Sequence, residues 1–143
     1  MSITITQFSI EEYDKVVSLW NLSEGIGLSS ADSRKNIQSF LDRNLGMSFV
    51  AHDNNLLVGA VLCGHDGRRG YIHHLAVHPD YRNQNIGRML AERCLIALKS
   101  IGIQKSHLFI FNNNQIGIEF WKKLGWTQRI DISVLSKPLE PTN

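Results

Sequence analysis

The stretch LAVHPDYRNQNIGRML, residues 75–90, decides the fold and carries most of the chemical information in this chain. It begins as an apolar strand, passes through a polar turn and continues as a helix whose apolar stripe starts at Ile86. The first turn of a helix leaves backbone N–H groups unpaired at the positive end of its dipole. The segment therefore predicts a cradle for phosphate oxygens, flanked by Arg82 and Arg88. The alternative is an ordinary capped helix with two solvated arginines.

The patterns on either side of this segment predict an α/β domain. Alternating or continuous apolar residues indicate strands at 3–6, 47–52, 56–63, 71–77 and 106–111, and two more at 126–130 and 132–135. Helical spacing follows a capping signal at Ser9, and a second helix, capped by Ser30 or Asp32, ends near Asn44. Further helices are expected from Ile86 to about Gly102 and from Gln115 to Leu124. The order is β-α-α-β-β-β-α-β-α-β-β, a mixed sheet with helices.

Composition describes one ordinary domain spanning residues 1–143. The 43% hydrophobic and 20% charged residues are close to average globular usage, and the net charge is only +2. That balance argues against a nucleic-acid-binding arm or a membrane anchor. The longest apolar run, 56–63, is far short of a membrane span, and the N-terminus lacks a signal-peptide pattern. Cys63 and Cys94 are expected to be buried free thiols in a reducing cytoplasm.

Two segments resemble the GNAT superfamily of N-acetyltransferases. LAVHPDYRNQNIG looks like the family's acetyl-CoA motif, V-x-P-x-[YF]-R-x-x-G-x-G, and NQIGIEFWKKLGW (114–126) is similar to its N-x-x-A-x-x-[FL]-Y-x-x-x-G-F segment. The expected element order also matches this family over nearly the whole chain. The resemblance implies a GNAT fold, with a mixed, mostly antiparallel sheet and about four helices.

The resemblance also implies acetyl-CoA as co-substrate and assigns residues to it. The strand residues whose backbone would pair with the pantetheine arm are Leu75, Ala76 and Val77. The residues that would wrap the pyrophosphate are Arg82, Asn83, Gln84, Asn85, Ile86 and Gly87, with Arg88 opening the helix. Asn114 matches the family asparagine that hydrogen-bonds the cofactor near the next helix.

The chain departs from the family pattern at glycine and tyrosine positions. Asn85 replaces the first motif glycine and Asn83 another frequent one, although asparagine tolerates a left-handed backbone. The added bulk predicts weaker cofactor affinity than a glycine version would have. Trp121 occupies the position of the tyrosine that usually protonates the CoA thiolate, and indole is no comparable acid. A thiolate can leave unassisted and take its proton from water or the amine, so Trp121 is expected to serve helix packing.

The strand at 71–77 supplies a candidate base. Acyl transfer needs a neutral amine, and lysine-like amines are mostly protonated at neutral pH, so a base or water chain must remove a proton. Strict alternation places His73 and Tyr71 on one face of the strand and His74 on the other. Some arylalkylamine acetyltransferases resemble this chain here, with histidine at the position of His73. His73, with Tyr71, is the predicted base; alternatively, both histidines are half-buried strand residues.

The acceptor is expected between the first two helices and the sheet. Candidate residues for binding it are Trp20, Asn21, Glu24 and Leu28. Few carboxylates lie there, which argues against polyamines and leaves a small amine, an amino acid or a peptide N-terminus. No metal-ligand spacing and no nucleotide-binding glycine motif is present, so no metal is expected. The sequence predicts an N-acetyltransferase acting by direct transfer, as a monomer or homodimer, with no nucleic-acid or membrane partner. The alternative is a non-catalytic acyl-CoA-binding or regulatory module.

Overall fold

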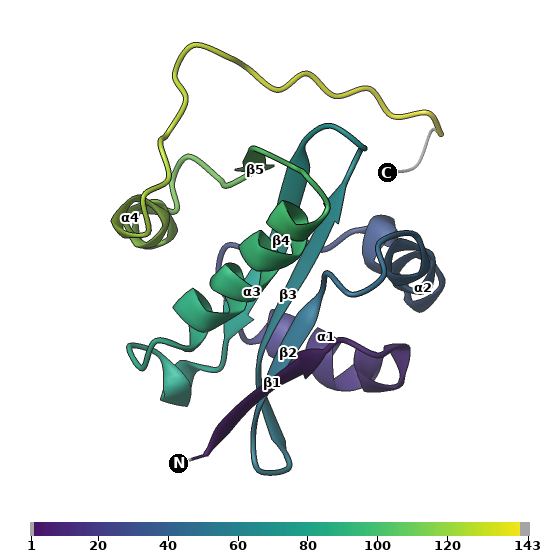
Figure 1. Ribbon diagram of the computed structural model, residues 1–143, viewed down its shortest axis with the longest axis vertical. Coiled ribbons are helices and arrows are strands. Elements are labelled where there is room, and N and C mark those ends of the chain that lie inside the picture. Colours follow the sequence, from purple (N-terminus) through teal and green to yellow (C-terminus); the bar gives the residue numbers. More distant parts are fainter. Residues whose placement is uncertain (1, 141–143) are drawn as a thin grey trace.

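The computed structural model describes residues 2–140 and gathers five strands into one sheet (Figure 1). The strands are β1 (Ile3–Gln7), β2 (Phe49–Asp53), β3 (Leu56–His65), β4 (Gly70–Val77) and β5 (Ser106–Leu108), in the spatial order β1-β2-β3-β4-β5. Neighbouring strands are antiparallel except β4 and β5, which run parallel. The mixed, mostly antiparallel sheet predicted from the sequence is therefore confirmed. β5 is shorter than expected and stops before Phe109.

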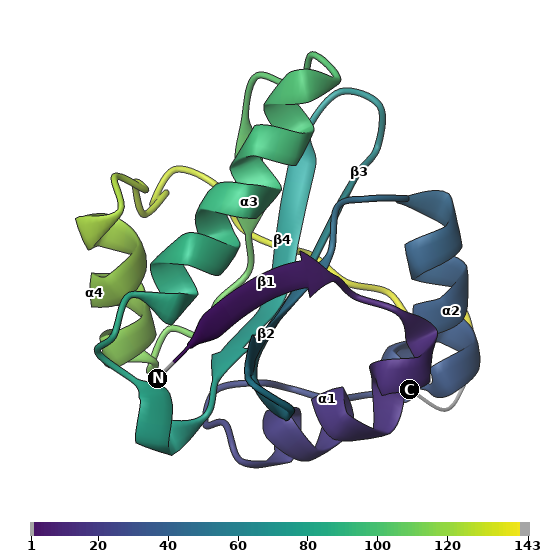
Figure 2. The ribbon, with the colours of Figure 1, turned by 60° about the horizontal axis from the view of Figure 1, so that its bottom comes forward.

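Helices cover both faces of this sheet (Figure 2). They are α1 (Tyr13–Asn21), α2 (Arg34–Arg43), α3 (Ile86–Ser100) and α4 (Gln115–Lys123), with short 3-10 turns η1 (Ile10–Glu12), η2 (Ser30–Asp32) and η3 (Pro79–Tyr81). Ser33 is the N-cap of α2, one residue beyond the predicted Asp32, because Ser29 and Asp32 close a capping box on η2 instead. No helix within residues 2–140 is long and apolar enough to cross a membrane.

Two apolar clusters lie on opposite faces of the sheet. One joins α3 and Trp121 of α4 to residues such as Val58, Val61 and Ile72. The other joins α1 and α2 to residues such as Val50 and Ala60. β3 lies between them and is buried from Leu57 to Cys63, because side chains on both of its faces are covered. Cys63 and Cys94 are buried and free, as predicted, and the neighbouring thiol together with burial raises the pKa of Cys94.

A bulge in β4 overturns the predicted alternation of its side chains. Leu62 of β3 faces His73 and Ala60 faces Ala76, so two steps along β3 match three along β4. The extra residue falls at His74, which has a left-handed backbone with φ of 53°. As a result His74 contacts the α1 side, at Trp20, and His73 contacts the α2 side, at Phe40. The prediction that His74 shares a face with Ile72 is wrong, because alternation holds only within an unbroken ladder.

The two strands predicted after α4 do not form within the described part of the chain. Residues 126–140 hold no strand, and the chain bends at 130–131, where Arg129 pairs with Asp131. Ile130, Ile132 and Val134 alternate as strand residues do, yet they are 93%, 56% and 66% exposed. Alternation expresses a propensity, whereas a strand also needs a partner for its backbone hydrogen bonds.

Candidate functional site

β4 and β5 separate halfway along β4 and leave an open strand edge. Pairing covers only Gly70 to Ile72, opposite Ser106 to Leu108. From His73 to Val77 the edge of β4 that faces β5 has no strand partner among residues 2–140. Exposed backbone donors and acceptors on such an edge can pair with an extended ligand that carries amide groups. Leu75, Ala76 and Val77 lie on this free edge, as the sequence predicts for a pantetheine-binding strand.

The free edge leads directly into the turn before α3, the cradle formed by residues 82–88. Asn83 and Asn85 are both left-handed, with φ of 63° and 66°, which allows the chain to reverse into the helix without glycine. Asn85 is the N-cap of α3 and makes no side-chain capping hydrogen bond within the described chain. The N–H groups of the first helical turn therefore remain for a ligand. Arg82 Nε donates to Val77 O at 3.2 Å, which ties the turn to the end of β4.

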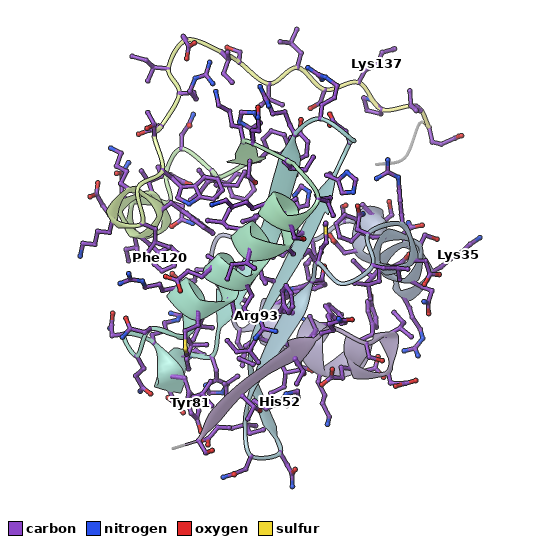
Figure 3. The ribbon with its side chains drawn as sticks, viewed as in Figure 1. Lys35, His52, Tyr81, Arg93, Phe120 and Lys137 are labelled. Carbon is purple, nitrogen blue, oxygen red and sulfur yellow. The ribbon has the colours of Figure 1, made fainter. Side chains whose placement is uncertain are left out.

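Packing against α4 and β2 holds this cradle in place. A Cβ on Gly87 would come within 3.1 Å of the Phe120 ring of α4, so only glycine fits there without displacement (Figure 3). On the other side Tyr81, also labelled in Figure 3, donates its hydroxyl to Asp53 Oδ2 at 2.7 Å. That hydrogen bond lowers the pKa of Asp53 and raises the pKa of Tyr81. Gln84 and Ile86 complete the turn, and Arg88 Nε donates to Glu92 Oε1 at 3.0 Å.

The second family-like segment forms α4. Asn114 is its N-cap and accepts from the Gly117 N–H at 2.9 Å with its side-chain Oδ1. Trp121 is 9% exposed and meets the rings of Phe120 and Trp126 at about 5 Å. The tryptophan in the usual acid position is thus a packed core side chain.

The α1 and α2 side of the sheet, here called the acceptor face, carries a histidine–aspartate hydrogen bond that sequence reasoning missed. Asp32 Oδ1 lies 2.9 Å from His74 Nε2, and their side chains are 12% and 21% exposed. Trp20, 1% exposed, meets the His74 ring edge-on at 5.1 Å. The partners are 42 residues apart, so no local pattern signals the pair. In the sequence, Asp32 is recognisable only as a possible N-cap of the second helix.

His73 lies in an aromatic wall made by Tyr71, His107, Phe109 and Phe40. Its ring stacks nearly parallel on that of Tyr71, with 6.5 Å between centroids. Burial lowers the pKa of His73, the neighbouring His74 adds to the shift, and Asp32 opposes it. Phe109 is 63% exposed, so the wall borders solvent where β4 and β5 separate. His73 and Tyr71 are therefore adjacent, as predicted.

The end of α1 and the loop from there to η2 carry three of the four predicted acceptor residues. Asn21 ends α1, and the exposed Glu24 and Leu28 lie on the loop. A Cβ on Gly25 would come within 2.6 Å of Asn114 Nδ2, and one on Gly27 within 3.1 Å of the Phe111 ring. The loop thus lies against the β5–α4 connection. Three of the four predicted acceptor residues are at the surface here, whereas Trp20 lies in the core below.

Candidate metal ligands do not cluster in the described chain. Among residues 2–140 there is no group of three or more histidine, cysteine, aspartate or glutamate residues that could hold a metal ion.

Comparisons with known proteins show which family this chain resembles. The model of the Acetyltransferase (GNAT) family matches residues 13–126. The chain is 30% identical over 132 residues to Acetyltransferase ECA0875 of Pectobacterium atrosepticum, covering 92% of each chain. It is 28% identical over 135 residues to Acetyltransferase SG1711 of Sodalis glossinidius, covering 94% of each.

Solved structures share the fold at lower identity. The PaiA N-acetyltransferase from Thermoplasma acidophilum, in complex with coenzyme A, superposes with a TM-score of 0.77 at 20% identity, covering 87% of this chain and 89% of that one. The ribosomal-protein-S18-alanine N-acetyltransferase from Escherichia coli gives a TM-score of 0.72 at 21% identity, covering 87% and 77%.

Proposed function

Because the chain belongs to the GNAT acetyltransferase family, we propose that it transfers an acetyl group from acetyl-CoA to a primary amine by direct attack in a ternary complex. The observation that carries the proposal is the free edge of β4, residues 73–77, which continues into the N-terminus of α3. A strand edge that pairs with amide groups and a cradle that accepts phosphates follow one another in the order that a pantetheine-diphosphate requires.

The residues present fit such a ligand. Glycine at position 87 keeps the cradle clear beside Phe120, and the left-handed Asn83 and Asn85 turn backbone N–H groups toward one side. Arg82 and Arg88 would add positive charge next to the phosphates. Leu75, Ala76 and Val77 would offer backbone groups to the pantetheine arm.

Acetyl-CoA would supply an activated thioester, and the chain would supply position and polarity. Backbone N–H groups along the β4 edge would orient the arm and donate to the thioester carbonyl. Trp121 stands where the family usually has an acidic tyrosine, so the departing thiolate would take its proton from water. The sequence pattern makes His73 and Tyr71 the first candidates for deprotonation of the amine.

The acceptor we propose is a small amine, an amino acid or a peptide N-terminus. The loop carrying Asn21, Glu24 and Leu28 would lie beside it, and the aromatic wall around His73 would contact its side chain. Glu24, Asp32 and Asp42 are too few carboxylates to favour a polyamine.

A thiol-release screen tests the proposal. Purified protein with acetyl-CoA is assayed against 2-phenylethylamine, alaninamide, a tripeptide with N-terminal serine, and putrescine, and products are identified by mass. We expect N-acetylated product with at least one of the first three. CoA binding without turnover on any amine would favour the regulatory module, and failure to bind CoA would contradict both.

A pair of arginine variants gives the matched control. Arg82→Ala should weaken CoA binding about tenfold, the effect of losing one charge-assisted contact. Arg68→Ala removes the same charge from the β3–β4 turn, where the side chain is 80% exposed, and should leave CoA affinity unchanged. Equal effects of the two changes would assign the arginine contribution to net charge alone.

A further inference from the structure

We propose that His74, held by Asp32, is the general base that accepts the proton of the acceptor amine. The inference rests on the proposed acetyl transfer and names the base for it. It moves this role from His73, to which the sequence pattern points, to the neighbouring residue. Four observations support it: the backbone of His74, its partner, its free ring nitrogen and its place on β4.

The backbone of His74 is the first observation. A histidine with φ of 53° occupies a region that costs free energy for any residue with a side chain, and glycine or asparagine occupies it more readily. The bulge that produces this conformation turns the imidazole onto the acceptor face, next to Trp20. An unbroken strand would point residues 73 and 74 to opposite faces.

Asp32 fixes both the orientation and the tautomer of this ring. Its Oδ1 lies 2.9 Å from Nε2 of His74, and its Oδ2 accepts from the Ser29 N–H at 3.1 Å. Tyr13 anchors the same residue by donating its hydroxyl to the Asp32 carbonyl at 2.6 Å. A carboxylate held in this way requires Nε2 to carry the proton, so the lone pair of the neutral ring sits on Nδ1.

The remaining nitrogen is free to act. Nδ1 of His74 has no hydrogen-bond partner among residues 2–140, and its side chain keeps 21% exposure. Next to it the indole Nε1 of Trp20 is buried and also has no partner in the described chain. A buried indole N–H without a partner is unusual in a packed interior, whereas Nδ1 of His74 belongs to a side chain that keeps contact with solvent.

The position along β4 completes the argument. Pairing with β5 ends at Ile72, and the pantetheine-binding residues begin at Leu75. His74 lies between these two points, one residue before the segment where the acyl arm would pair. His73 instead stacks on Tyr71 within the aromatic wall, and burial lowers its pKa.

The chemical step balances with these groups. The protonated amine first passes one N–H proton to Nδ1 of His74, and the neutral nitrogen then forms a bond to the acetyl carbon. The carbon–sulfur bond breaks, its electron pair stays on sulfur, and the thiolate takes up a proton through water in exchange for the second N–H proton. Asp32 stabilises the imidazolium, which returns its proton to solvent. The other titratable and charged groups around the pair are His73, Tyr13, and Arg34, whose guanidinium lies over the Tyr13 ring.

Kinetics of three variants test this assignment with acetyl-CoA and whichever amine of the screen has the highest kcat/KM. His74→Asn keeps a residue that tolerates the left-handed backbone and should lower kcat at pH 7 about 100-fold. Asp32→Asn should lower it about tenfold, and His65→Asn, at the end of β3, should leave it unchanged. CoA affinity should stay within about twofold in all three, which shows that each variant is folded.

The pH profile separates a base from a structural residue. Without a base only amine that is already neutral reacts, so kcat/KM of His74→Asn should climb tenfold per pH unit toward the amine's own pKa, and the deficit should shrink at pH 9.5. His73→Phe should keep the wild-type profile shape even where its rate falls. A uniform loss at every pH in His74→Asn would overturn the proposal.

A readout without turnover comes from nitrogen-15 NMR of the imidazoles. Neutral His74 should appear as the Nε2–H tautomer with an unprotonated Nδ1, and Asp32→Asn should weaken that preference. The Nδ1–H tautomer would overturn the assignment. If the wild type acetylates no amine, the proposed function fails and the base with it. If it does and His74→Asn matches it, only the base assignment fails.

Discussion

The two sides of β4 are built in contrasting ways. On the α3 side the cradle of residues 82–88 comes from one continuous stretch, in which two asparagines have a left-handed backbone and Gly87 packs closely against Phe120. On the acceptor face the contacting residues come from separate elements, such as Asp32 from η2 and His74 from β4. The cradle is therefore formed by residues that are neighbours in the sequence, whereas the contacts of the acceptor face join residues that only folding brings together.

The strongest way to break the acceptor face is Trp20→Ala. The side chain is 1% exposed and supports the His74 ring, so its loss should cost about 3–5 kcal/mol of unfolding free energy and most of the turnover. Urea titration and the thiol-release assay measure both. Trp126→Ala removes the same side chain from a half-exposed site on the other side and should cost clearly less. Equal losses would contradict the role of Trp20 as the support of this face.

Gly87→Val should break the cofactor side. The new side chain would meet the Phe120 ring, where a Cβ alone comes within 3.1 Å, and the resulting shift should cost about 1–3 kcal/mol of stability. CoA affinity should fall as well, because α3 has to move away from α4 and its first turn is part of the cradle. Calorimetric titration with CoA measures it. Unchanged affinity would mean that the ligand does not approach the first turn of α3.

Asn85→Gly should sharpen the cofactor side. Glycine adopts a φ of 66° without strain and removes bulk from the cradle, so CoA should bind about two- to fivefold more tightly, or up to about 1 kcal/mol. Asn54→Gly makes the same change at a left-handed turn between β2 and β3 and should not affect CoA binding. Unchanged or poorer affinity in Asn85→Gly would contradict the bulk argument.

The smallest effect concerns the pH dependence of stability at His73. Burial lowers the pKa of this residue in the folded state, so the folded protein binds fewer protons than the unfolded chain, in which histidine titrates near 6.5. This contribution to stability is complete above the unfolded pKa and is lost as pH falls through the folded pKa. Urea unfolding at pH 8 and pH 5.5 should show a smaller difference for His73→Phe than for the wild type. An equal difference in both proteins would contradict the assignment.

The same contrast explains how far the sequence could predict the structure. The strand, turn and helix of residues 75–90 were predicted because turn and helix signals are local, whereas the cofactor contacts of single residues in this stretch came from the family resemblance and remain predictions. The bulge at His74 was not, since it depends on how β3 and β4 pair over distance, and it changed which face two histidines occupy. The strands predicted at 126–130 and 132–135 do not form, because these residues have no strand partner within the described part of the chain. Asp32 was identified as a cap, but its second role needed the tertiary fold to bring His74 within 2.9 Å.

The central claim is that CoA lies along the free edge of β4 and the N-terminus of α3. Titrating nitrogen-15-labelled protein with CoA and following the backbone amides tests it directly. The account predicts the largest shifts at residues 74–77 and 83–88, with small ones in β1 and α2. Saturable binding that shifts other amides and leaves those two segments unchanged would contradict it.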